Sequence, residues 1–135
     1  MIQFYFLSIV LNFLAGYALS SDAENRSGSL DGVRDLFHDE TMRLVLGILS
    51  MAVGFFKLLT VVRGDIPVVG DLFPSLAGLG AGFALTLEFY RARSTVQSIA
   101  SERLELIFVK NRKWLGMAAM VSAAAHFLFP TVLFL

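Results

Sequence analysis

The sequence has no cysteine among its 135 residues. Disulfides, thiolate metal sites and cysteine-ligated iron–sulfur clusters are therefore excluded, and the redox compartment cannot be inferred from cysteine usage. Charge is also scarce, because 16% of the residues are charged, against roughly 25% in an average soluble domain. The 11 basic and 11 acidic residues give a formal net charge of zero, so overall charge does not favour nucleic acid as a partner.

Apolar residues dominate instead, at 56% of the chain with a mean hydropathy of +0.71. Four apolar runs cover residues 2–19, 42–62, 72–90 and 114–134. Each run reaches the roughly 17–25 residues that a helix needs to cross a bilayer. The runs are continuous rather than alternating, which excludes a transmembrane β-barrel. The predicted fold class is therefore an all-α integral membrane protein with four transmembrane helices in one domain, residues 1–135.

Two stretches of the chain resemble each other. Residues 15–20 (AGYALS) recur as residues 81–86 (AGFALT), a shift of 66. At a shift of 69, Arg43, Gly47 and Met51 reappear as Arg112, Gly116 and Met120. The sequence thus predicts two tandem hairpins, about 1–62 and about 67–135. Because both hairpins run in the same direction, the repeat is parallel and its pseudo-two-fold axis lies along the membrane normal.

Small residues recur every three or four positions on one face of each predicted span. In lipid, burial of apolar surface gives no driving force, and small residues let helices pack closely. The predicted helix-packing residues are Gly16, Gly47, Gly54, Gly78, Gly82 and Gly116.

The distribution of basic residues predicts orientation. The connections at residues 20–41 and 91–113 lie on one face, and the second holds most of the lysine and arginine. The positive-inside rule places both connections in the cytoplasm and both termini outside. No basic residue precedes the first apolar run, so we interpret it as a retained span rather than a signal peptide. The basic residues, which are candidates for contact with anionic lipid or a partner, are Arg91, Arg93, Arg103, Lys110, Arg112 and Lys113.

The two connections carry opposite net charge, since acidic residues dominate the first. Two interpretations stay open: solvated loops, with the basic one held at anionic headgroups, or loops that dock on each other within or between chains. Each connection also contains a short amphipathic segment, expected at the interface or as an inward extension of the following helix. Their apolar residues are Leu30, Val33, Leu36 and Phe37 in the first, and Val96, Ile99, Leu104, Ile107 and Phe108 in the second.

Ionisable residues inside the predicted spans are the main site candidates. Lys57 aligns with His126, and each lies about 21 Å beyond the inner arginine of its span at 1.5 Å per residue. A charge at this depth costs roughly 2.5–3.5 kcal/mol on insertion scales. Lys57 therefore either snorkels toward Asp65 or Asp71 at the outer surface, or contributes to a polar site near the axis. For His126, the simpler interpretation is a neutral histidine bonded to a neighbouring helix.

Expectations also follow for three other polar residues of the spans. Glu88, near the inner end of the third span, is expected to pair locally with Arg91 or Arg43, with a role as a site carboxylate as the alternative. Asn12 is expected to form an interhelical hydrogen bond. Tyr5 is expected at the outer membrane interface, as aromatic belts prefer.

One arrangement resembles a metal site. Asp35, His38 and Asp39 share a helical face and include oxygen and imidazole ligands. The second hairpin has apolar residues at the aligned positions, so a solvated acidic turn is the more economical interpretation. No cofactor is predicted.

The sequence shows no nucleophile–base pair, no nucleotide-binding loop and no nucleic-acid patch. The favoured hypothesis is a non-enzymatic membrane protein, placed in the bacterial inner membrane by its charge bias, that self-associates or serves as an accessory subunit. The alternative is a small oligomeric channel or transporter with Lys57, His126 and Asn12 along its path. The third hypothesis is an enzyme at the cytoplasmic interface that uses Glu88 with Asp35, His38 or Asp39.

Overall fold

A computed structural model describes residues 2–21, 31–59, 72–95 and 99–129, and these residues are helical apart from short junctions. The order of elements is α1 (Ile2–Ser20), α2 (Asp31–His38), α3 (Glu40–Leu59), α4 (Leu72–Arg93), α5 (Ile99–Leu104), the π-helical turn η1 (Glu105–Val109) and α6 (Arg112–Leu128).

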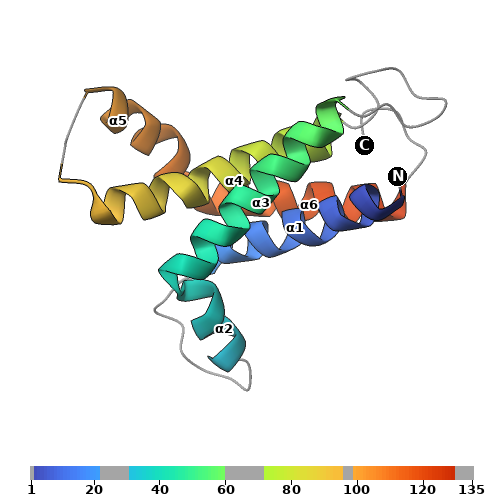
Figure 1. Ribbon diagram of the computed structural model, residues 1–135, viewed down its shortest axis with the longest axis horizontal. Helices are drawn as coiled ribbons and strands as arrows, with labels where there is room; N and C mark the ends of the chain where they lie inside the picture. Colours follow the sequence, from blue (N-terminus) through green and yellow to red (C-terminus); the bar gives the residue numbers. More distant parts are fainter. Residues whose placement is uncertain (1, 22–30, 60–71, 96–98, 130–135) are drawn as a thin grey trace.

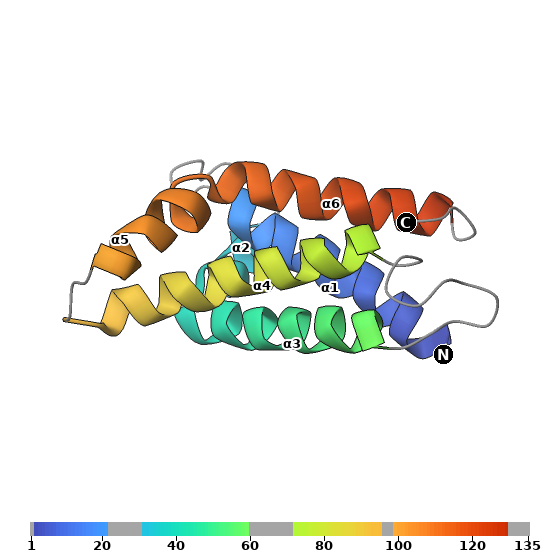
Figure 2. The ribbon, with the colours of Figure 1, turned by 90° about the horizontal axis from the view of Figure 1, so that it is seen from above.

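The four long helices α1, α3, α4 and α6 form an elongated bundle along the long axis (Figure 1). In this view α2 projects below the start of α3 and α5 lies above the end of α4, both on the left, while the start of α1 and the end of α6 lie on the right. The most extensive contacts join α3 to α4 and α1 to α6. Viewed from above, α4 lies between α3 and α6 (Figure 2). The bundle therefore consists of two close helix pairs that contact each other through α1 and α4.

Within the part of the chain that the structure describes, three helices are long and apolar enough to cross a membrane: Gln3–Ser20, Glu40–Leu59 and Leu72–Arg93. Large apolar side chains on these helices face outward, including Phe6, Phe55 and Phe73. Helix α6 has 17 described residues and also exposes apolar side chains such as Val121. The predicted fourth span continues to residue 134, beyond the described part of the chain, and stays a prediction.

Local sequence explains where the helices begin. Asp39 separates α2 from α3, and its carboxylate accepts a hydrogen bond of 2.9 Å from the Met42 backbone N–H, as an N-terminal cap does. Pro74 lies in the first turn of α4, where its missing N–H removes no helical hydrogen bond. The π-helical turn ends with the Lys110 N–H bonded to the Glu105 carbonyl at 2.9 Å.

Glycines mark the points where the paired helices touch. A Cβ at Gly16 would lie 2.5 Å from the Gly116 carbonyl oxygen, and a Cβ at Gly82 would lie 2.6 Å from the Gly47 carbonyl oxygen. Even alanine would therefore collide with the backbone of the facing helix. Gly54 meets the Ser75 carbonyl oxygen in the same way. The remaining predicted packing residue, Gly78, faces the side chain of Asn12.

The segments that connect the spans pack onto the bundle through aromatic contacts. Tyr17 of α1 meets Phe37 of α2 edge-on, with ring centroids 5.3 Å apart. Phe83 of α4 meets Phe108 of η1 edge-on at 4.8 Å. Tyr17 and Phe83 are aligned residues in the sequence repeat. Each amphipathic segment is thus attached to the span that precedes it.

We predict that Gly82→Ala lowers the free energy of unfolding by about 1–3 kcal/mol, because the new methyl group forces α3 and α4 apart. Thermal unfolding of the purified protein in detergent measures the change. Gly80→Ala is the matched control in the same helix, since a Cβ at Gly80 would meet nothing within 4 Å.

The control should leave stability unchanged or raise it by up to about 1 kcal/mol, because alanine favours helix more than glycine does. Equal effects of the two substitutions would contradict the close contact between α3 and α4.

Candidate functional site

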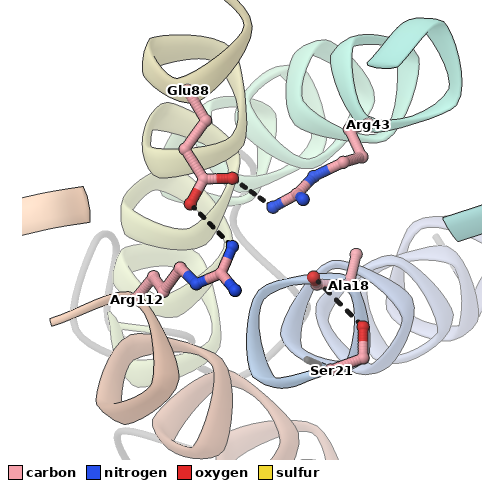
Figure 3. Close-up of polar contacts among 5 residues, drawn as sticks. All are labelled: Ala18, Ser21, Arg43, Glu88 and Arg112. Carbon is pink, nitrogen blue, oxygen red and sulfur yellow. Dashed lines mark hydrogen bonds and ion pairs between the residues drawn. The ribbon is translucent and has the colours of Figure 1, made fainter. Parts of the chain in front are cut away.

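Two polar clusters lie at opposite ends of the bundle. The first is centred on Glu88 of α4, which forms an ion pair with Arg43 of α3 (Figure 3). Arg112 of α6 approaches the other carboxylate oxygen at 3.6 Å. Arg43 and Glu88 expose only 13% and 14% of their side chains, so their attraction is screened less than at the surface. One carboxylate thus links three helices through two arginines that are aligned in the sequence repeat.

The remaining basic residues of this end have different surroundings. Arg91 pairs with Glu105 of η1 rather than with Glu88, which corrects one of the two partners expected from the sequence. Arg93 lies 3.6 Å from Glu40 and over the ring of Phe89. The Arg93–Glu40 pair joins the two oppositely charged connections, but both side chains are exposed, so its contribution to stability is small. Arg103, Lys110 and Lys113 are also exposed.

A cavity of about 250 Å³ adjoins the Glu88 cluster. Helices α2, α3 and α4 supply its lining. It brings His38 and Glu88 to one site, whereas Asp35 and Asp39 do not line it. The lining residues are His38, Glu40, Arg43, Glu88, Phe89 and Ala92.

The second cluster lies near the ends of α3 and α6, inside the bundle. Lys57 Nζ and His126 Nε2 are 2.7 Å apart, and their residues are 5% and 1% exposed. The burial of Lys57 favours the interior position over snorkelling. An ammonium group only donates hydrogen bonds, so a charged Lys57 requires a neutral His126 whose Nε2 accepts. The pair therefore carries at most one shared positive charge in this contact.

Tyr5 of α1 completes this cluster. Its hydroxyl donates a hydrogen bond of 2.7 Å to the His126 backbone carbonyl, and its ring lies 4.6 Å from the imidazole. The Lys57 ammonium is 5.7 Å from the centre of the same ring, within the range of a cation–π contact. Asn12, the other interior candidate, donates to the Pro74 carbonyl at 2.8 Å and so joins α1 to α4.

The structure does not assemble the metal candidate. Among the residues that it describes, no group of three or more His, Cys, Asp or Glu side chains could hold a metal ion. The carboxylate of Asp39 instead caps α3, where it accepts a hydrogen bond from the Met42 backbone N–H.

Sequence reasoning misses two participants, Tyr5 and Glu105. The position of Tyr5 in the sequence indicates only the outer interface, and its ring and hydroxyl contacts depend on how α1 packs against α6. From the sequence alone, Glu105 is only one acidic residue in the basic connection. Its distance from Arg91 along the chain gives no signal that η1 folds back onto α4.

The fold and its contacts define an all-helical protein with at least three helices suited to crossing a membrane. Residues 1–126 match the model of an uncharacterized protein family, and the chain belongs to this family. The chain is similar to an "Uncharacterized protein" of Treponema pallidum (strain Nichols), with 33% identity over 135 residues and 100% of both chains covered. No solved structure matches the chain.

We predict that Glu88→Gln lowers the free energy of unfolding by about 3 kcal/mol, because it leaves the largely buried Arg43 and the partly exposed Arg112 without their carboxylate. The matched control is Glu40→Gln, which breaks the exposed pair with Arg93 and should cost at most about 1 kcal/mol. Thermal or denaturant unfolding in detergent measures both. A Glu88→Gln protein as stable as the control would show that the cluster does not hold the helices together.

We predict that His126→Leu destabilises the protein by about 1–3 kcal/mol, because it removes a buried acceptor from the Lys57 ammonium. Lys57→Met should cost less, since the neutral imidazole that remains is cheaper to bury than a charge. The double variant should lose less unfolding free energy than the sum of the losses in the two single variants. Strict additivity in unfolding measurements would mean that the two side chains do not interact.

Proposed function

We propose that this protein is a small polytopic integral membrane protein without a catalytic role, which acts by association. Its partners would be further copies of itself or the subunits of a larger membrane assembly. The observation that carries the proposal is the direction of its side chains. Within the described residues, Glu88, Lys57 and Asn12 bond inside the bundle, while all four long helices present large apolar side chains outward.

We also propose that the chain has four spans arranged as two tandem parallel hairpins. Corresponding contacts support this arrangement. The Gly16–Gly116 contact between α1 and α6 matches the Gly82–Gly47 contact between α4 and α3 under the shifts of 66 and 69. The matching extends to neighbouring side chains, since Met120 lies against Gly16 and Met51 lies against Gly82.

The proposed orientation follows from the same arrangement. Helices α1 and α4 end, and α3 and α6 begin, at the Glu88 end of the bundle (Figure 1). Because the basic residues gather there, this end would face the cytoplasm of a bacterial cell and the protein would lie in the inner membrane. The Lys57 and His126 cluster would then lie toward the outer side.

Transport is the second candidate, and the intramembrane position of Lys57 and His126 favours it. In a single chain, however, these side chains contact each other and are almost fully buried, rather than lining a path. Transport would therefore require several copies. The enzyme hypothesis is weaker, because two arginines lie beside the Glu88 carboxylate. His38 lines the same cavity as Glu88, but Asp35 and Asp39 do not.

We expect native mass spectrometry of the protein, extracted with its native lipid, to show a homo-oligomer or a stoichiometric complex with another membrane protein. Some of the outward-facing apolar side chains would contact lipid, and others would contact such a partner. The matched comparison is the same sample after exchange into a harsher detergent, which should release the single chain. A monomer alone in native lipid would contradict action by association.

A further inference from the structure

Two exposed lysines lie beside the most exposed aromatic ring that the structure describes. Lys110 and Lys113 are both exposed, and Trp114 is 72% exposed, more than any other large apolar residue in the described part of the chain. Arg112, which lies between the lysines in the sequence, instead approaches Glu88 inside the bundle. The outward positive charge at this place therefore comes from the two lysines. We call these three outward side chains, of Lys110, Lys113 and Trp114, the lysine–tryptophan surface.

The segment that forms this surface contains no acidic residue to balance its charge. Residues 106–135 include three lysine or arginine residues and no aspartate or glutamate. The last acidic residue of the chain, Glu105, forms an ion pair with Arg91 of α4. The acidic residue before it, Glu102, is exposed and is followed directly by the exposed Arg103. The local excess of positive charge therefore complements a negatively charged partner.

An apolar face of α6 continues from the lysine–tryptophan surface. Trp114, Met117 and Val121 are all exposed, and their spacing of three or four residues places them on one side of the helix. The charged groups are thus confined to one end of a face that is otherwise apolar. A phospholipid has the same division, with a charged headgroup at one end of apolar acyl chains. This division favours a lipid over a protein as the partner.

The residue types of the surface agree with the boundary between headgroups and acyl chains. Tryptophan is enriched at this level of a membrane, because its ring is largely apolar and its N–H group can reach a polar partner. Lysine can lay its apolar stem along the acyl chains and place its ammonium group at a phosphate. Every phospholipid offers a phosphate, but lysine is attracted more strongly to a membrane whose lipids carry net negative charge. The partner is therefore an anionic phospholipid.

We propose that the lysine–tryptophan surface binds an anionic phospholipid, with the lysines at its headgroup and Trp114 at the level where its acyl chains begin. This inference rests on the membrane location in the proposed function. It does not depend on association, because a single chain supplies the whole surface.

Trp114 is the single tryptophan of the chain, so its fluorescence reports on this surface alone. The test uses the full-length protein in vesicles of equal amounts of phosphatidylglycerol and phosphatidylcholine. In one preparation the phosphatidylglycerol carries bromine on its acyl chains, and in the other the phosphatidylcholine does. Bromine quenches tryptophan only at close range, so comparison of the two preparations gives the ratio of the two lipids beside Trp114. We expect a ratio of about fivefold or more in favour of phosphatidylglycerol, because one lysine near an anionic surface contributes about this factor.

Three variants locate the preference. Replacing Lys110 and Lys113 together by glutamine should bring the ratio close to one, whereas replacing both by arginine keeps the charge and should keep the preference. Arg93→Gln is the control for position, since this exposed residue belongs to α4 and lies beside Glu40. The control should retain the preference of the native chain. Because all of these side chains are exposed, the unfolding temperature in neutral detergent should change little in any variant.

Equal quenching by the two brominated lipids in the native chain overturns the proposal. A preference that survives replacement of both lysines by glutamine also overturns it. Weak quenching by both lipids would mean that a protein surface covers Trp114, and this result contradicts the proposal as well. A protein that stays monomeric in these vesicles but shows the predicted preference supports the lipid surface and contradicts only association.

Discussion

Backbone contact between helices, made possible by glycine, is the constraint on which the rest of the structure depends. In a lipid surrounding, apolar side chains gain nothing by leaving lipid for protein, so helices associate through close packing and polar contacts. The Gly16–Gly116 and Gly47–Gly82 contacts bring α1 against α6 and α3 against α4. The lateral positions of the polar side chains in the bundle follow from these two helix pairs.

The two polar clusters, at opposite ends of the bundle, differ in their chemistry. At one end, an acid lies between two arginines, and the attraction contributes to joining α3, α4 and α6. At the other end, Lys57 meets His126, and these two basic groups can share a proton but do not attract each other as opposite charges do. The first cluster thus fits a structural role well. The second holds the protein's most unusual interior groups, and it is where a transport function would have to act.

Much of the fold could be predicted from the sequence, but the partners of the polar residues could not. Apolar runs set the positions of α1, α3 and α4, because length and hydropathy are local properties. The identity of each glycine contact was beyond reach, since a small-residue face does not specify which helix it meets. Likewise, the sequence allows the Lys57 side chain to extend outward or inward. Its direction is determined by the packing of α1 and α6 around it. The cavity at His38 is lined by residues of α2, α3 and α4, and the sequence does not indicate that these three helices meet there.

The duplication that we propose can be tested most directly by distances between spin labels, because the chain has no cysteine to remove before labelling. The exposed positions Leu7 and Met117 form one pair, and Phe73 and Ile48 form the aligned pair. Under the shifts of 66 and 69, a pseudo-two-fold axis exchanges these two pairs. We predict that both doubly labelled proteins give distance distributions with the same maximum in lipid bilayers. Clearly separate maxima would contradict the arrangement of the chain as two equivalent hairpins.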